Sequence, residues 1–135
     1  MPELRLIAEE TRSAGDVLAA WLPRVAVALV FLSVGSEKFG AHGPWIRIFA
    51  RIGIGDWFRY LTGTLQVGGA LLLFVPPLVR VGAIVLGCTM VGAIVTNIFI
   101  LDTGLAAIIP SALLAAVIFV GLRAPKISSR RRTDA

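Results

Sequence analysis

The stretch from Val81 to Leu101, with the sequence VGAIVLGCTMVGAIVTNIFIL, contains no charged side chain. A helix rises ~1.5 Å per residue and the hydrocarbon core of a bilayer is about 30 Å thick, so a helix of this length can cross it. The stretches Tyr60 to Val79 and Gly104 to Leu122 are also free of charge, and Val17 to Ser36 contains only Arg24. The sequence therefore predicts an all-α integral membrane protein with four transmembrane helices.

Composition supports the same class. Hydrophobic residues make up 57% of the 135 residues and the mean hydropathy is +0.87, which leaves too little polar surface for a soluble globule of this size. The single cysteine, Cys88, lies inside the third predicted span, and the single histidine, His42, lies in a loop. We therefore expect no metal site, no haem site and no intrinsic cofactor.

The basic residues predict the orientation. We expect a cytoplasmic N-terminal segment at residues 1–16, a four-helix membrane domain at 17–122 and a basic cytoplasmic tail at 123–135. With four spans, nine Lys and Arg side chains lie on the side of the termini and four on the other. The positive-inside rule then places both termini in the cytoplasm and the protein in the plasma (cytoplasmic) membrane, the inner membrane of a cell that has two. The positive charge fits this orientation better than a nucleic-acid partner.

The connections predict how the spans are arranged. Pro76-Pro77 and Asp102-Thr-Gly104 form tight turns, so consecutive spans must be antiparallel neighbours in an up-down-up-down bundle. The long connection after the first span places Trp45, Ile46 and Phe49 at helical spacing. This pattern predicts a short amphipathic helix lying on the membrane surface between the first and second spans.

Polar side chains from three spans are predicted to meet in one layer in the outer half of the bundle. Gln66 lies about 9 Å below the start of the second span and Asn97 about 6 Å below the end of the third. The candidate ligand-binding cluster comprises Ser33, Glu37, Lys38, Thr62, Gln66, Thr96 and Asn97. The alternative interpretation is interhelical hydrogen bonding that stabilises packing.

The two charged residues of this cluster carry the stronger functional indication. A charge at membrane depth costs several kcal/mol unless it is paired, faces water or extends to the interface. Lys38 can extend its side chain outward from the helix end, whereas the shorter Glu37 needs a partner such as Arg59, Lys38 or a bound ligand.

Four short runs suggest a family. They are Phe31 to Phe39 (FLSVGSEKF), Phe49 to Trp57 (FARIGIGDW), Tyr60 to Gly69 (YLTGTLQVGG) and Met90 to Ala93 (MVGA). Together they resemble the DoxX and DoxX-like membrane proteins over about residues 20 to 122. The resemblance implies four helices, an amphipathic stretch after the first, and a link to quinone-dependent membrane oxidoreductases. In many relatives an acidic residue stands at Gln66 and a histidine at Asn97, so this chain lacks two titratable groups.

Three classes of function are open. The first is an accessory or small-ligand-binding subunit of a membrane oxidoreductase system, with a quinone as ligand and a membrane or peripheral redox protein as partner. The second is a non-enzymatic scaffold or assembly factor. The third is a small proton-coupled transporter, although Glu37 lies at a helix end and transporter sites lie near the bilayer midplane. Glycine and alanine residues on the third and fourth spans also suit self-association into a homo-oligomer.

Overall fold

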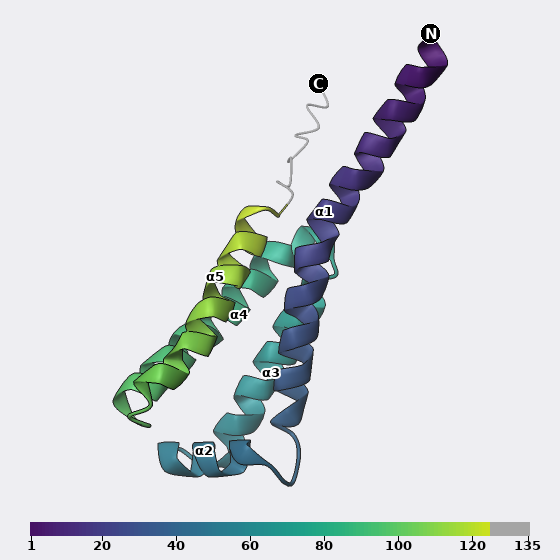
Figure 1. Ribbon diagram of the computed structural model, residues 1–135. Helices are drawn as coiled ribbons and strands as arrows, with labels where there is room; N and C mark the ends of the chain where they lie inside the picture. Colours follow the sequence, from purple (N-terminus) through teal and green to yellow (C-terminus); the bar gives the residue numbers. More distant parts are fainter. Residues whose placement is uncertain (125–135) are drawn as a thin grey trace, which may run out of the picture.

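The computed structural model describes residues 1–124, and this part of the chain contains helices and no strand (Figure 1). The predicted all-α class is confirmed. The five α-helices are α1 (Pro2–Glu37), α2 (Pro44–Ile52), α3 (Asp56–Leu72), α4 (Val79–Phe99) and α5 (Ile108–Leu122). Two 3₁₀ turns, η1 (Pro76–Leu78) and η2 (Gly104–Ala107), precede α4 and α5.

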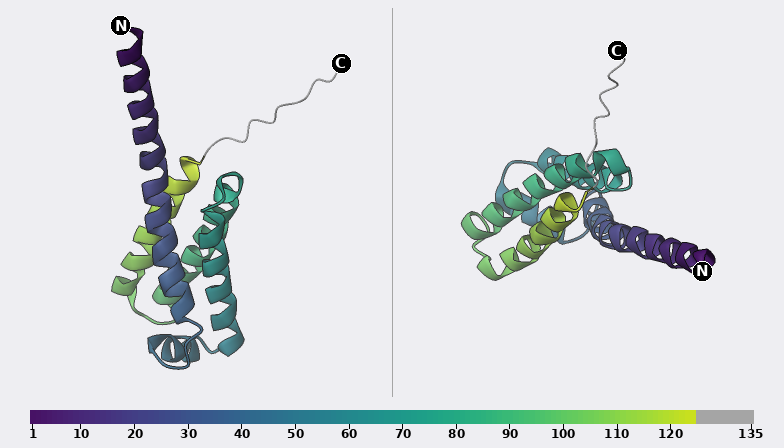
Figure 2. Two further views of the ribbon diagram at one scale, coloured as in Figure 1. Left: turned by 90° about the vertical axis from the view of Figure 1, so that its right-hand side faces the viewer. Right: turned by 90° about the horizontal axis from the view of Figure 1, so that it is seen from above.

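The four longer helices run alternately in opposite directions (Figures 1 and 2). In chain order, α1 packs against α3, α3 against α4 and α4 against α5, and α1 also touches α5. The N-terminus, η1 and the end of α5 lie at one end of the molecule, and α2 lies across the other end. The up-down-up-down order expected from the short connections is thus the order of these helices.

Within residues 1–124, three helical segments are long and apolar enough to cross a membrane. They are Pro2–Glu37, Pro76–Phe99 and Gly104–Leu122. They indicate a multi-pass integral membrane protein. The fourth apolar stretch of the sequence corresponds to α3, which begins at Asp56 and has 17 residues. Helix α3 ends before Val75. Pro76 disfavours helical geometry at the residue before it, and Val75 is extended, with φ −103° and ψ 105°.

Helix α1 is a single helix of 36 residues. The boundary expected after residue 16 lies inside it. Residues 2–20 of this helix are exposed, and its N-terminal part projects beyond the bundle (Figure 2). Leu, Glu, Arg and Ala dominate this segment and are strong helix formers, which explains why the helix continues through it. Of the basic tail expected at 123–135, the part from residue 125 lies outside the described residues.

The core of the bundle is built around close helix contacts. Phe31, Leu73 and Leu86 are the largest fully buried side chains. A Cβ atom on Gly82 would lie 2.7 Å from the carbonyl oxygen of Gly69, so the α3–α4 crossing leaves no room for a larger residue. Small residues allow this approach where lipid offers no hydrophobic driving force. The packing thus holds α3 firmly between α1 and α4.

The predicted amphipathic helix in the long connection is confirmed as α2. Phe49 is buried and Trp45 is half-buried, whereas Arg47 and Arg51 are exposed. Gly53 ends the helix with φ 79°, in the left-handed region that favours glycine. The apolar face of α2 therefore covers one end of the α1–α3 pair.

Candidate functional site

Lys38 is the centre of the candidate site. It follows the last residue of α1, and its side chain is only 5% exposed. Its Nζ donates a hydrogen bond to Oε1 of Gln66 on α3. Nζ also lies 4.8 Å from the ring centre of Trp45 and 5.9 Å from that of Phe49, both on α2. The ammonium group is thus held by one amide oxygen and two aromatic faces, a favourable cation–π setting.

Close packing of α1 on α3 brings Lys38 and Gln66 together. A Cβ atom on Gly63 would lie 3.1 Å from the carbonyl oxygen of Gly35 and 3.2 Å from Cβ of Lys38. A Cβ atom on Gly35 would in turn lie 3.1 Å from Cβ of Gln66. The two glycines therefore allow the helix backbones to approach until the lysine and the glutamine meet.

A second buried cation, Arg59, lies beside Lys38. Its side chain is 3% exposed, and Nη1 donates to the carbonyl oxygens of Lys38 and of Gly40, the latter at 2.9 Å. Its Nη2 donates to the hydroxyl of Tyr60 at 3.1 Å. Its Nε is buried without an acceptor among the described residues. Arg59 thus fixes the chain after α1, and its buried Nε–H is free for another acceptor.

We call Lys38, Gln66, Arg59, Trp45 and Phe49 the Lys38 cluster. Burial lowers the pKa of Lys38 from 10.5 to about 8, so a proton leaves it more readily than from an ordinary lysine. The cluster contains two basic side chains and no carboxylate. Its N–H groups can donate hydrogen bonds to a carbonyl or other electron-rich oxygen.

Glu37 joins the site through α2. Its Oε2 accepts a hydrogen bond from Nε1 of Trp45 at 3.2 Å, and the residue itself is exposed. Within residues 1–124, Glu37 forms no ion pair with Arg59 or Lys38, the protein partners considered for it. The indole that lies over Lys38 is therefore also tied to the carboxylate beside it.

The other predicted site residues bond locally. The hydroxyls of Thr62 and Thr96 donate to the carbonyls of Arg59 and Gly92 in their own helices. Nδ2 of Asn97 donates to the carbonyl of Ala93 at 2.8 Å, and its Oδ1 accepts from Thr103 at 3.1 Å.

Ser33 is exposed, and its carbonyl accepts from the hydroxyl of Ser36 at 2.9 Å. The structure thus brings Lys38, Gln66 and, through Trp45, Glu37 together. No hydrogen bond joins Ser33, Thr62, Thr96 or Asn97 to the side chain of Lys38 in the described structure.

The sequence suggests Arg59 only as a partner for Glu37, and its spacing predicts that Trp45 and Phe49 lie on a surface helix. A signal for Arg59 is present in the sequence, because it is a lone basic residue next to an uncharged stretch and must be paired or face water. For Trp45 and Phe49, only the fold shows that α2 folds back over Lys38. Residues 1–124 contain no group of three or more His, Cys, Asp or Glu side chains that could hold a metal ion.

Comparison with known proteins assigns the family. A curated relative from Bacillus subtilis (strain 168), named "Putative oxidoreductase CatD", is 28% identical over 75 residues, which cover 56% of this chain and 56% of the relative. The match thus spans about half the length of that relative. No solved structure matches the chain. The model of the DoxX-like family matches residues 22–120, which include α3, α4 and almost all of α5, so this chain belongs to the DoxX-like family of membrane proteins.

Proposed function

We propose that this protein is an accessory membrane subunit of an oxidoreductase system and that the Lys38 cluster binds a quinone through a carbonyl oxygen. Membership of the DoxX-like family and similarity to a relative named as an oxidoreductase support the redox setting. The observation that carries the ligand class is the pair of buried cations, Lys38 and Arg59, with a buried N–H that lacks an acceptor.

An acceptor ligand suits this arrangement for a physical reason. A buried donor without a partner costs about 1–3 kcal/mol, and a hydrogen bond from a charged group contributes about 1.5–3 kcal/mol. A quinone carbonyl would satisfy such donors, and the rings of Trp45 and Phe49 offer flat apolar surfaces for a planar headgroup. Because these rings now cover Lys38, entry of the ligand requires α2 to move away from α3.

The membrane arrangement proposed with this function has four spans. Helix α3 supplies the fourth, since its 17 residues and the turn after it cover about 26 Å or more, close to the ~30 Å hydrocarbon thickness. The excess of basic residues at the end with the N-terminus, η1 and Arg123 supports a cytoplasmic location for both termini. Lys38 then lies at the outer end of the spans, just after α1 and beneath α2, where a lipid-soluble ligand reaches it once α2 moves aside.

A fluorescence titration tests the ligand directly. With Trp21 and Trp57 replaced by Phe, Trp45 is the sole tryptophan and lies against Lys38. We expect a short-chain quinone to quench it saturably in the parent and at least about tenfold more weakly in Lys38→Met, because a charge-assisted hydrogen bond is lost. Asn97→Leu, outside the cluster, is the control. Linear, unsaturable quenching that is equal in all three proteins would refute the quinone site.

The scaffold interpretation predicts the opposite pattern. A non-enzymatic assembly factor would retain its protein partner in a mild detergent and show no saturable quenching. A pull-down of the wild type and of Lys38→Met with the same set of membrane proteins is therefore read beside the quenching. A partner retained by both proteins, with no saturable quenching by quinone in either, would indicate a scaffold.

A further inference from the structure

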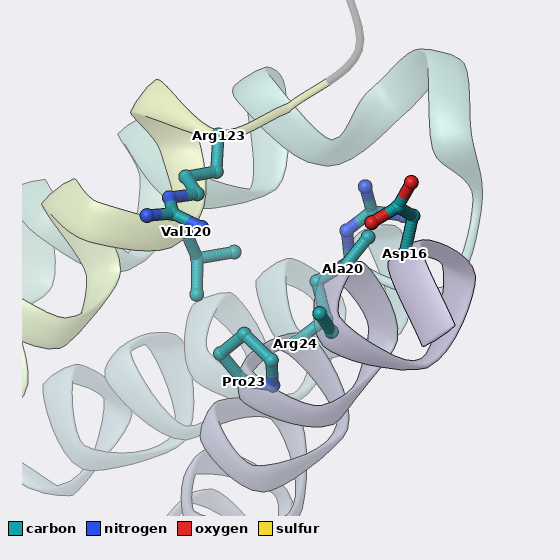
Figure 3. Close-up of a pocket in the computed structure, with 7 residues that line it drawn as sticks. Asp16, Ala20, Pro23, Arg24, Val120 and Arg123 are labelled. Carbon is teal, nitrogen blue, oxygen red and sulfur yellow. The ribbon is translucent and has the colours of Figure 1, made fainter. Parts of the chain in front are cut away.

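A second polar site lies at the opposite end of the bundle. A cavity of about 170 Å³ opens between α1 and the end of α5 (Figure 3). It is lined by Asp16, Ala19, Ala20, Pro23, Arg24, Val120 and Arg123. Arg24 precedes Lys38 by 14 residues on α1, about 21 Å along the helix, so this cavity is separate from the Lys38 cluster. We call it the Arg24 cavity.

Arg24 is buried without a polar partner among residues 1–124. Its side chain is 6% exposed and forms no hydrogen bond or ion pair there, while its Cζ lies 5.0 Å from the ring centre of Trp21. A guanidinium is always charged and has five N–H donors, so it cannot avoid the cost of burial by losing a proton. Such a group in an apolar helix indicates a functional site by default. No Arg24 nitrogen is fully buried without a partner among residues 1–124, so its donors reach the cavity, where water or a ligand supplies the acceptors.

A second arginine lines the same space. Arg123, an exposed residue at the end of α5, lies across the cavity from α1 (Figure 3). Its Cζ lies 4.8 Å from the ring centre of Phe119. Asp16 is the one acidic residue in the described lining, and it forms no ion pair with either arginine. The lining therefore carries a net charge of +1, two arginines less one aspartate, around a space far larger than the ~10–15 Å³ that one water needs.

We propose that the Arg24 cavity binds a phosphate group, supplied either by an anionic phospholipid or by free phosphate. The planar fork of arginine matches phosphate oxygens in pairs and is less strongly hydrated than an ammonium group. Ala19, Ala20 and Pro23 line the rest of the α1 side with short side chains, which leaves the space open. An anion here relieves the repulsion between Arg24 and Arg123 and supplies the missing acceptors. This site is independent of the proposed function.

The full-length chain in a mild, phosphate-free detergent tests the proposal. Native mass spectrometry counts bound phosphatidylglycerol or phosphatidylcholine, and equilibrium dialysis measures radiolabelled inorganic phosphate. We expect Arg123→Gln to weaken binding about tenfold, because one charge-assisted pair is lost. Arg80→Gln is the control, since it removes an exposed arginine at the same end of the bundle that does not line this cavity. The basic tail is the same in every variant.

Three further variants test whether the arginine and aspartate side chains act on the phosphate directly. Arg24→Gln removes the buried charge, and Arg24→Lys keeps it without the planar fork, so loss of binding in both folded variants supports direct recognition. Asp16 is exposed and should not be needed for folding. We expect Asp16→Asn to tighten binding about threefold, because it removes a negative charge that faces the phosphate.

Each result decides the proposal. Preferential binding of phosphatidylglycerol without inorganic phosphate identifies a lipid headgroup as the source, and binding of inorganic phosphate identifies the free ion. Either supports a phosphate site. Absence of both, or an equal loss in Arg80→Gln and Arg123→Gln, would overturn it. Weaker binding in Asp16→Asn would also overturn it, because removal of a carboxylate that faces a bound phosphate must reduce the repulsion.

Discussion

The side chains of Lys38 and Gln66, 28 residues apart in the chain, form a buried hydrogen bond across the α1–α3 contact. Nζ of Lys38 is the donor and Oε1 of Gln66 the acceptor. The bond depends on the close approach of the two helices at Gly35 and Gly63, and α2 covers it from outside. It therefore links the packing of the bundle to the candidate ligand site.

Replacing Gln66 by Leu should destabilise the protein. The change removes the one side-chain acceptor that Lys38 has among residues 1–124 and leaves a buried cation unpaired, at a cost of about 1–3 kcal/mol or more. Thr64→Val is the control, because Thr64 is on the same helix, exposed, and bonds only to the carbonyl of Tyr60. Unfolding in mixed micelles measures both. Equal stability of the two variants would show that the bond contributes nothing.

Replacing Gly63 by Ala should separate α1 from α3. The added Cβ would lie 3.1 Å from the carbonyl oxygen of Gly35, and overpacking of this kind costs about 1–3 kcal/mol. Gly68→Ala adds the same methyl group to the same helix where no atom lies within 4 Å. We expect Gly63→Ala to lower the unfolding temperature and Gly68→Ala to leave it unchanged or raise it. If the unfolding temperature fell by the same amount in both variants, the effect would come from replacing glycine in α3 and not from the contact with α1.

The stability of the protein should rise between pH 8 and pH 10.5. Burial lowers the pKa of Lys38 to about 8, whereas in the unfolded chain it stays near 10.5. In this window the unfolded chain holds a proton that the folded chain has released, so raising the pH favours folding, by up to roughly 3 kcal/mol over the window. Below pH 8 both states are protonated, and the contribution no longer changes.

The difference in unfolding free energy between wild type and Lys38→Met isolates this contribution, since other titrating groups are common to both. We expect that difference to be constant from pH 6 to pH 7.5 and to shift in favour of the wild type from pH 8 upward. A difference that does not change up to pH 9.5 would mean that Lys38 keeps an ordinary pKa in the folded protein.

Arg59→Lys should loosen the connection between α1 and α2. Lysine keeps the charge but loses the fork with which Arg59 bonds to the carbonyls of Lys38 and Gly40. Arg47→Lys is the matched control, because Arg47 lies on the exposed face of α2. Limited proteolysis should cut the connection around Gly40 to Gly43 faster in Arg59→Lys. Identical cleavage rates in the two variants would contradict the anchoring role.

The sequence could predict much of the fold because apolar length is a local property. The long uncharged stretches correspond to helices, the prolines at 76 and 77 mark a turn, and the spacing of Trp45 and Phe49 indicates α2. Continuation of α1 to Pro2 was not predicted, since charges in residues 1–16 were interpreted as a separate segment. Charge shows where a helix is exposed and does not show where it begins.

The candidate site was predicted only in part for a related reason. Depth along each helix correctly brought Gln66 and Lys38 to one level, but depth does not specify which way a side chain turns. Asn97 instead bonds to Ala93 and Thr103, within and just beyond its own helix. The role of Arg59 depends on the path of the chain after α1, which no spacing rule encodes.

The most direct test of the central claim is the amount of quinone that co-purifies with each chain in a gentle detergent. We predict a near-stoichiometric amount in the wild type and in Asn97→Leu, and only traces in Gln66→Leu and Lys38→Met, because the latter two break the buried pair. Equal traces of quinone in all four proteins would contradict the account and leave the Lys38–Gln66 bond as a contact that stabilises helix packing.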